Sequence, residues 1–223
     1  MPRPEWLLVI AAAALLVHYY FLRADVVGVY SVARGWHALT GRALPPLFHY
    51  LGSGLMLAVL PVLAARWLTG LGFRELGLGL GRWREGLVWL AVGVPLAVAA
   101  GMIGAASTGQ RAVYPLDPTI APTLASFAPY ALLQFLYYGS WEVLFRAVLL
   151  FGLRGPMGDG PANLAQTGVS VTAHFGRSLD ETLPSLPAGL VFGWLTLRLR
   201  SVWVVALLHW VTGVSQDWFI LHH

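Results

Sequence analysis

The sequence contains no cysteine and no lysine, and only 11% of its residues are charged. Without cysteine, the chain cannot form disulfides, thiolate metal sites or a cysteine nucleophile. The 14 basic residues are all arginines and are scattered between apolar runs, so binding of nucleic acid is not expected. Soluble domains carry roughly 25% charged residues, and this chain has too little polar surface to cover such a fold.

Apolar residues are abundant instead, at 57% of the chain with a mean hydropathy of +0.68. A helix that spans a membrane needs about 20 mostly apolar residues. The sequence therefore predicts an all-α, polytopic transmembrane helical bundle of about seven spans, with six to eight compatible. The apolar runs lie near residues 5–22, 46–68, 86–106, 125–153, 162–176, 184–198 and 201–220.

The connections between these runs carry glycine and proline, which end helices. Residues 70–84 form a glycine-rich linker, and loops are expected at 107–122 and 155–160. None of these linkers is long enough to separate two domains. We therefore predict one integral-membrane domain over residues 1–223, with membrane lipid as its surroundings.

Ionisable residues inside apolar runs are the strongest functional signal, since each costs roughly 2.5–3.5 kcal/mol at membrane depth. Glu142 and Arg146 lie four residues apart, so they share a helix face and can neutralise each other. Taken alone, this pair fits a structural ion pair as well as it fits chemistry.

Two histidines on other segments favour chemistry. His174 ends the fifth apolar run, and His209 lies in the middle of the last. A glutamate and two imidazoles in one bundle can activate water, with one group accepting the proton and a second imidazole stabilising an oxyanion. The same side chains could also bind a divalent metal such as zinc, but the double-histidine spacing of zinc proteases is absent, so no cofactor is expected. His18 and His49 are predicted to be interfacial.

Three short segments, WEVLFR (141–146), SVTAH (170–174) and HWVTG (209–213), carry a family resemblance. They are similar to the motifs EExxxR, FxxxH and HxxxN or HxxxD of the CAAX-protease and bacteriocin-processing family of intramembrane endopeptidases. The resemblance covers about residues 125–215 as a catalytic core. It implies catalytic roles for Glu142, His174 and His209, with Arg146 holding the glutamate.

The chain departs from the family pattern at three positions. Trp141 replaces the first glutamate, which is the one usually assigned as the water-activating base. Ser170 replaces the phenylalanine of the second motif, and Gly213 replaces the asparagine or aspartate of the third. One branch of the family is similar in having a tryptophan there and an H-x-G-[KR]…E segment, which implies that Glu181 adds a second carboxylate.

Two functions remain open. The chain is either an intramembrane endopeptidase that activates water with Glu142 (or Glu181) and His174, or a catalytically inactive member of the family. An active enzyme would cleave a peptide or a membrane-anchored protein, whereas an inactive one would act as a binding, immunity or scaffold protein. A transporter would also suit buried ionisable residues, but the paired repeats it requires are not visible. The resemblance implies a multi-pass protein of the bacterial plasma membrane.

Overall fold

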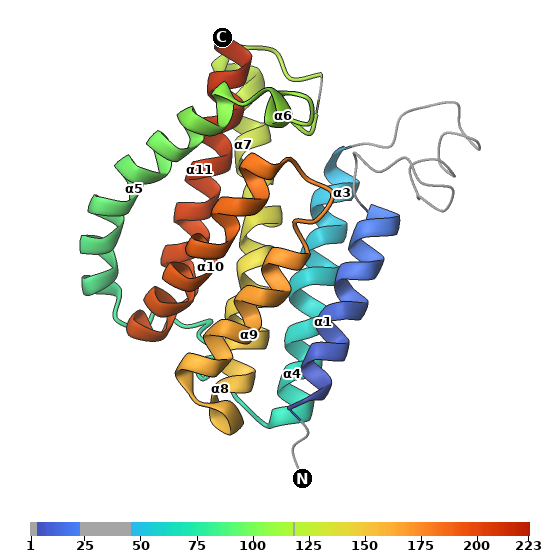
Figure 1. The fold of residues 1–223 in the computed structure, drawn as a ribbon, viewed down its shortest axis with the longest axis vertical. Coiled ribbons are helices and arrows are strands. Elements are labelled where there is room, and N and C mark those ends of the chain that lie inside the picture. Colours follow the sequence, from blue (N-terminus) through green and yellow to red (C-terminus); the bar gives the residue numbers. More distant parts are fainter. Residues whose placement is uncertain (1–3, 23–45, 118) are drawn as a thin grey trace.

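The computed structural model describes residues 4–22, 46–117 and 119–223, which fold as helices without any strand (Figure 1). The prediction of an all-α helical membrane bundle is confirmed, and each of the seven apolar runs is helical. The elements are α1 (Trp6–Val17), the π-helix η1 (His18–Leu22), α3 (Pro46–Ser53), the π-helix η2 (Gly54–Val59), α4 (Leu60–Thr69), α5 (Trp83–Ala106), α6 (Thr108–Arg111), α7 (Leu124–Glu142), the π-helix η3 (Val143–Phe151), α8 (Gly152–Met157), α9 (Asp159–Thr172), α10 (Leu179–Leu199) and α11 (Trp203–His222).

Four continuous helical stretches of the described chain are long and apolar enough to cross a membrane: Leu47–Thr69, Trp83–Ala106, Leu124–Met157 and Trp203–His222. The helix over Trp6–Leu22 is also apolar but shorter. α9 and α10 complete the bundle, but neither is both long enough and apolar enough to count among these four stretches. Large apolar side chains on the outer surface, such as Val88 at 63% exposure, suit contact with lipid rather than water.

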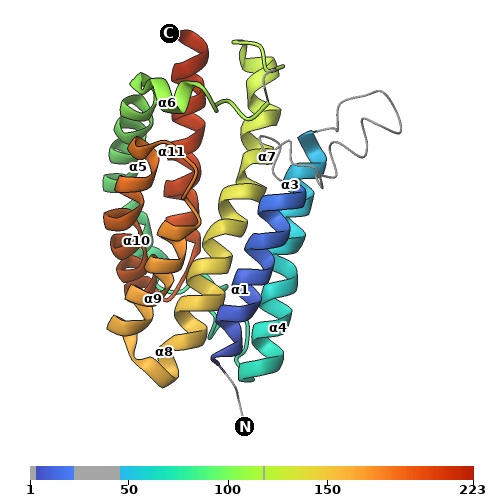
Figure 2. The same cartoon turned by 45° about the vertical axis from the view of Figure 1, so that its right-hand side comes forward.

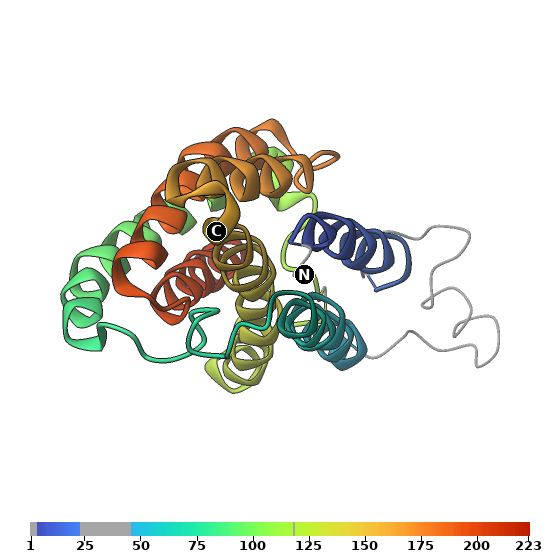
Figure 3. The same ribbon diagram turned by 90° about the horizontal axis from the view of Figure 1, so that it is seen from below.

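The stretch Leu124–Met157 is the centre of the bundle. It runs unbroken through α7, η3 and α8, and 89% of its apolar window is buried by the rest of the protein. α1 and α4 lie on one side of it, and α9, α10 and α11 lie on the other (Figures 2 and 3). A charged side chain on this helix therefore has to find its partner inside the protein.

The central helix changes its winding directly after Glu142, where the π-helix η3 begins. Every residue of η3 is buried, including Phe145 and Leu149. Short π-helical stretches inside α-helices are rare and often lie at functional positions. The change of winding therefore marks the part of the bundle where the motif residues were expected.

The outermost span, α5, packs closely against α11 through glycines. A Cβ atom added at Gly101 would lie 2.7 Å from the backbone carbonyl oxygen of Thr212, and one added at Gly93 would lie 2.7 Å from Leu208. The absence of side chains at these positions lets the two helices approach, as small residues commonly do between membrane helices.

The glycine-rich linker closes the end of the bundle at which α10 turns into α11. Gly77 accepts a hydrogen bond from the Val202 amide at 3.0 Å, and the Arg82 amide donates to the Leu199 carbonyl at 2.8 Å. Gly81 has a φ of +54°, and a Cβ atom there would overlap the Leu199 carbonyl oxygen. Glycine is therefore required at this position both for its backbone conformation and for space.

Two expected loops differ from the structure. At 155–160 the only break is Gly158, with a φ of +84°, because α8 continues to Met157 and α9 starts at Asp159. The segment 107–122 contains the short helix α6, whose first turn is capped by the Ser107 hydroxyl accepting from the Gln110 amide at 3.3 Å. Turn-forming residues indicated the positions of the breaks but not their lengths.

The α5–α11 packing leads to a stability prediction. Gly101→Ala is expected to lower the free energy of unfolding by roughly 1–3 kcal/mol, since its methyl group would meet a backbone carbonyl that cannot move aside. Gly168→Ala is the matched control, because that site in α9 has open space around it and should gain roughly 0.5–1 kcal/mol. Unfolding by sodium dodecyl sulfate in mixed micelles measures both. Equal effects of the two substitutions would contradict the close packing.

Candidate active site

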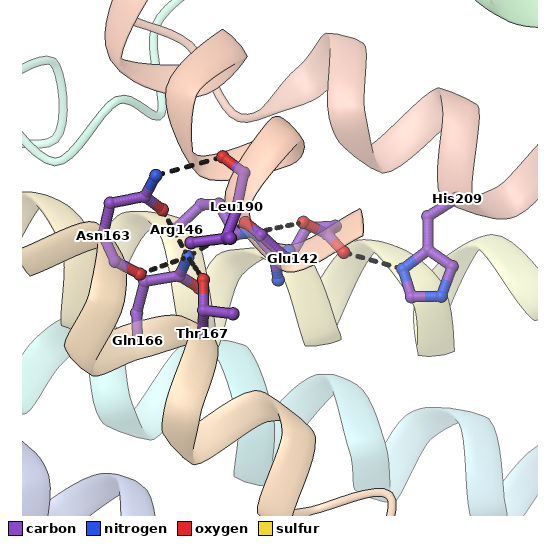
Figure 4. Close-up of polar contacts among 8 residues, drawn as sticks. Glu142, Arg146, Asn163, Gln166, Thr167, Leu190 and His209 are labelled. Atoms are coloured by element: carbon purple, nitrogen blue, oxygen red, sulfur yellow. Dashed lines mark hydrogen bonds and ion pairs between the residues drawn. The ribbon is translucent and has the colours of Figure 1, made fainter. Parts of the chain in front are cut away.

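Glu142 lies at the junction of α7 and η3, and its side chain is completely buried. Its Oε2 is 3.0 Å from Nε of Arg146, one turn further along the central helix. Its Oε1 accepts a hydrogen bond from Nδ1 of His209 on α11 at 2.7 Å. Figure 4 shows Glu142 between these two partners, so one carboxylate joins the predicted ion pair to the predicted histidine.

His209 is held in a defined orientation by this contact. Because a carboxylate only accepts hydrogen bonds, Nδ1 of His209 carries the proton in this pair. The ring remains 26% exposed, in contrast to the fully enclosed Glu142. The other ring nitrogen, Nε2, is thus the atom of His209 that can exchange a proton with a bound molecule.

His174 lies in the turn between α9 and α10, outside the four candidate spans. Its Nδ1 is 2.7 Å from the Ser170 carbonyl oxygen and donates to it, which leaves a lone pair on Nε2. Burial lowers the pKa of His174 to about 4, so the ring is neutral at pH 7. Gly176 shapes this turn with a φ of +89°, a conformation that favours glycine.

Glu181 lies in the first turn of α10, seven residues after His174. Its Oε1 accepts a hydrogen bond from the Tyr114 hydroxyl at 3.1 Å and is 3.8 Å from Nε of Arg177. Burial raises the pKa of Tyr114 well above its usual range, so this hydroxyl keeps its proton and remains a donor. The carboxylate of Glu181 is therefore positioned from two sides.

All five predicted site residues line one cavity of about 1000 Å³. A second cavity of about 390 Å³ lies on the α1 side, and it shares four residues with the first. The two cavities thus meet at the candidate site. The shared residues are Trp141, His174, Glu181 and His209.

Trp141 occupies the position of the missing first glutamate. Its ring packs at 4.9 Å from the Phe145 ring and edge-on at 5.3 Å from the His174 ring. The residue is 7% exposed and takes part in the buried apolar cluster around the central helix. An aromatic side chain therefore lines the site at the position where the family pattern has a carboxylate.

α9 is fixed to α10 by two side-chain amides, of which Gln166 is fully buried. Nδ2 of Asn163 donates to the Leu190 carbonyl at 3.0 Å (Figure 4), and Nε2 of Gln166 donates to the Gly189 carbonyl at 3.1 Å. These bonds hold together the two helices that flank the His174 turn. The turn is therefore carried by a rigid helix pair, which a catalytic group requires.

Sequence reasoning missed a second buried polar contact between α7 and α11. Asp217 is fully buried, and its Oδ2 accepts hydrogen bonds from the Tyr130 hydroxyl and from Nε2 of Gln134, each at 2.5 Å. A signal for it was present, because Asp217 is an acid in the last apolar run and lies eight residues after His209. That spacing puts both on one helix face.

His18 and His49 are buried inside the protein, at 2% and 5% exposure, and their interfacial location stays a prediction. Their rings lie 5.6 Å apart, and each also contacts the ring of Tyr137 on the central helix. Packing of η1 and α3 against α7 encloses them. Within the described ranges, no group of three or more His, Asp or Glu residues is arranged to hold a metal ion.

The Glu142–Arg146 pair leads to a second stability prediction. Glu142→Gln is expected to lower the free energy of unfolding by roughly 3–5 kcal/mol, because Arg146 would stay buried without an anion. The double variant Glu142→Gln with Arg146→Met should recover much of that loss. Unfolding in mixed micelles measures both proteins.

The control is the exposed ion pair of Arg154 and Asp159, which lie 3.0 Å apart. Asp159→Asn should change the free energy of unfolding by no more than about 1 kcal/mol. A loss in Glu142→Gln no larger than that of the control, or no recovery in the double variant, would contradict the buried pair.

Comparison with known proteins gives one match. The family model described as type II CAAX prenyl endopeptidase Rce1-like matches residues 120–215. Neither the curated proteins nor the solved structures contain a match to the chain. The matched range contains all three motifs and all five site residues, and with the apolar spans it indicates an integral membrane protein. The resemblance predicted from the motifs is confirmed, since residues 120–215 of this chain match the model of the Rce1-like family of type II CAAX prenyl endopeptidases.

Proposed function

We propose that the chain is an active intramembrane endopeptidase that hydrolyses a peptide bond in the larger cavity. The observation that carries this proposal is the 2.7 Å hydrogen bond between Glu142 and His209, formed beside His174 on the wall of one cavity. An orienting carboxylate, the imidazole it holds and a second imidazole are sufficient for hydrolysis with activated water. A structural ion pair alone would not require either histidine.

His174 is the base in this proposal. Its Nε2 has a free lone pair because Nδ1 is bonded to the Ser170 carbonyl, and the ring is neutral at pH 7. The water oxygen bonds to the carbonyl carbon while the water proton passes to Nε2 of His174. When the C–N bond breaks, the leaving nitrogen takes this proton.

His209 is the second imidazole, and its role is to stabilise the oxyanion. Because Nδ1 donates to Glu142, donation from Nε2 requires the doubly protonated ring, and this imidazolium donates from Nε2 to the carbonyl oxygen as negative charge develops there. The contact with Arg146 keeps the Glu142 carboxylate in its charged form and in place. Glu181, also at the cavity, supplies a second negative charge near His174 and assists water activation.

The substrate in this proposal is a peptide or a membrane-anchored protein. The larger cavity is lined by apolar side chains of α5 and α10, among them Leu96, Ile103, Leu183 and Phe192. An apolar segment of a substrate can enter such a space from the lipid, which is the protein's other partner. The setting we propose is the bacterial plasma membrane, with no cofactor in the mechanism.

A second candidate function rests on Trp141. With an aromatic ring in place of the first glutamate, the chain could be a catalytically inactive family member that binds a peptide in the same cavity. It would then act as a membrane binding, immunity or scaffold protein. Both functions require that the peptide binds, so binding does not distinguish them. Only the active enzyme cleaves the peptide.

A cleavage assay tests the proposal. The protein purified in detergent is incubated with a library of membrane-anchored peptides, and products are identified by mass spectrometry. We expect the wild type to cleave a subset of the peptides, and His174→Gln and His209→Gln to lower kcat by about 100-fold or more, since each removes a proton-transfer or oxyanion group. His222→Gln, on an exposed ring at the end of α11, is the control and should cleave like the wild type.

Several outcomes would decide against this mechanism. Cleavage at the wild-type rate by both active-site variants would remove the roles of the two histidines. Binding of peptides without cleavage by the wild type would favour the inactive member. Loss of activity with a chelator, restored by zinc, would favour the alternative in which the same side chains bind a metal.

A further inference from the structure

Tyr138 lies one turn before Glu142 on α7, and its side chain crosses to α11. Its ring centroid is 4.8 Å from that of His209. Its hydroxyl and ring fill the space beside Gly213, one turn after His209. The tyrosine thus lies next to the Glu142–His209 pair, on the side toward the Tyr130–Asp217 contact.

Gly213 is required for this placement. A Cβ atom added at Gly213 would overlap the Tyr138 hydroxyl and its ring carbons. The backbone of Gly213 is ordinary α-helix, so the glycine provides space rather than an unusual conformation. A side chain at 213 and the observed position of Tyr138 are therefore mutually exclusive, and the family pattern has its asparagine or aspartate at that position.

The Tyr138 hydroxyl differs from the two other buried tyrosine hydroxyls near the site. The Tyr130 hydroxyl is bonded to Asp217, and the Tyr114 hydroxyl is bonded to Glu181. Within the described ranges, the Tyr138 hydroxyl makes no such hydrogen bond, although the residue is only 7% exposed. Tyr138 lines the larger cavity together with His174 and His209, so its donor is available to a molecule bound there.

We propose that the Tyr138 hydroxyl is a catalytic donor. Together with His209, it donates a hydrogen bond to the carbonyl oxygen of the scissile peptide as negative charge develops there. It occupies the space of a side chain at 213 and supplies the donor that Gly213 lacks. A neutral O–H group fixed by packing needs little reorganisation when the charge forms, which is what makes such donors effective. This inference rests on the proposed endopeptidase function.

Tyr138→Phe is the direct test, since it removes the oxygen and keeps the ring against His209. We expect kcat to fall by about 100-fold or more with little change in KM, because the donor acts on the transition state. Tyr20→Phe, on a half-exposed ring of η1, is the control and should leave both constants unchanged. A Tyr138→Phe protein with wild-type kcat would overturn the inference.

A side-chain exchange separates a donor from mere packing. Gly213→Asn alone should lose both stability and activity, because its side chain overlaps Tyr138. Tyr138→Ala creates room, and adding Gly213→Asn to it should raise kcat at least about 10-fold over Tyr138→Ala by returning a donor near His209. The matched double variant, Tyr138→Ala with Gly213→Leu, fills the same space without a donor and should not recover activity.

The outcomes distinguish this inference from the proposed function. Equal activity of the asparagine and leucine double variants would show that Tyr138 only packs, and would overturn the donor role alone. An active wild type with inactive His174→Gln and fully active Tyr138→Phe would do the same. A wild type that cleaves no peptide would overturn both.

Discussion

The buried Glu142 carboxylate is the constraint on which the rest of the structure depends. A carboxylate and a guanidinium on a helix surrounded by protein are tolerated only if each finds its partner with good geometry. Arg146 meets Glu142 along the helix, and His209 meets it from α11. The central helix therefore has to be covered on all sides. The position of α11 along α7, and the face that α11 turns toward α7, are both determined by this contact.

That requirement shows in the contact between α7 and α11, which repeats once per helical turn. Glu142 faces His209, Tyr138 faces Gly213, and Gln134 faces Asp217. These residues are four apart along each helix, and the two helices run in opposite directions. Two of the three levels are polar contacts that a shift of one helix along the other would break, so they determine how α7 and α11 align.

Two of the three departures from the family pattern, at positions 141 and 213, are filled by aromatic rings. Trp141 forms the wall between the two cavities at the position of the first glutamate, and Tyr138 fills the space beside Gly213. The proposed chemistry follows from these replacements. The water proton passes to the imidazole of His174 rather than to a carboxylate, and the oxyanion is stabilised by His209 and the Tyr138 hydroxyl. Packing and chemistry are thus coupled at this site, because the same rings that fill the cavity wall also determine which donors face the substrate.

The sequence by itself determined the helices, the pairing of Glu142 with Arg146, and the resemblance to the family whose model matches residues 120–215. All of these depend on local properties: apolar run length, the four-residue spacing on one helix, and short motifs. Only the tertiary structure showed that Glu142 also bonds to His209, that Asp217 is buried, and that Tyr138 needs Gly213. Each of these contacts joins helices far apart in the chain, and their crossing depends on the packing of the whole bundle, which periodicity along a single helix does not encode.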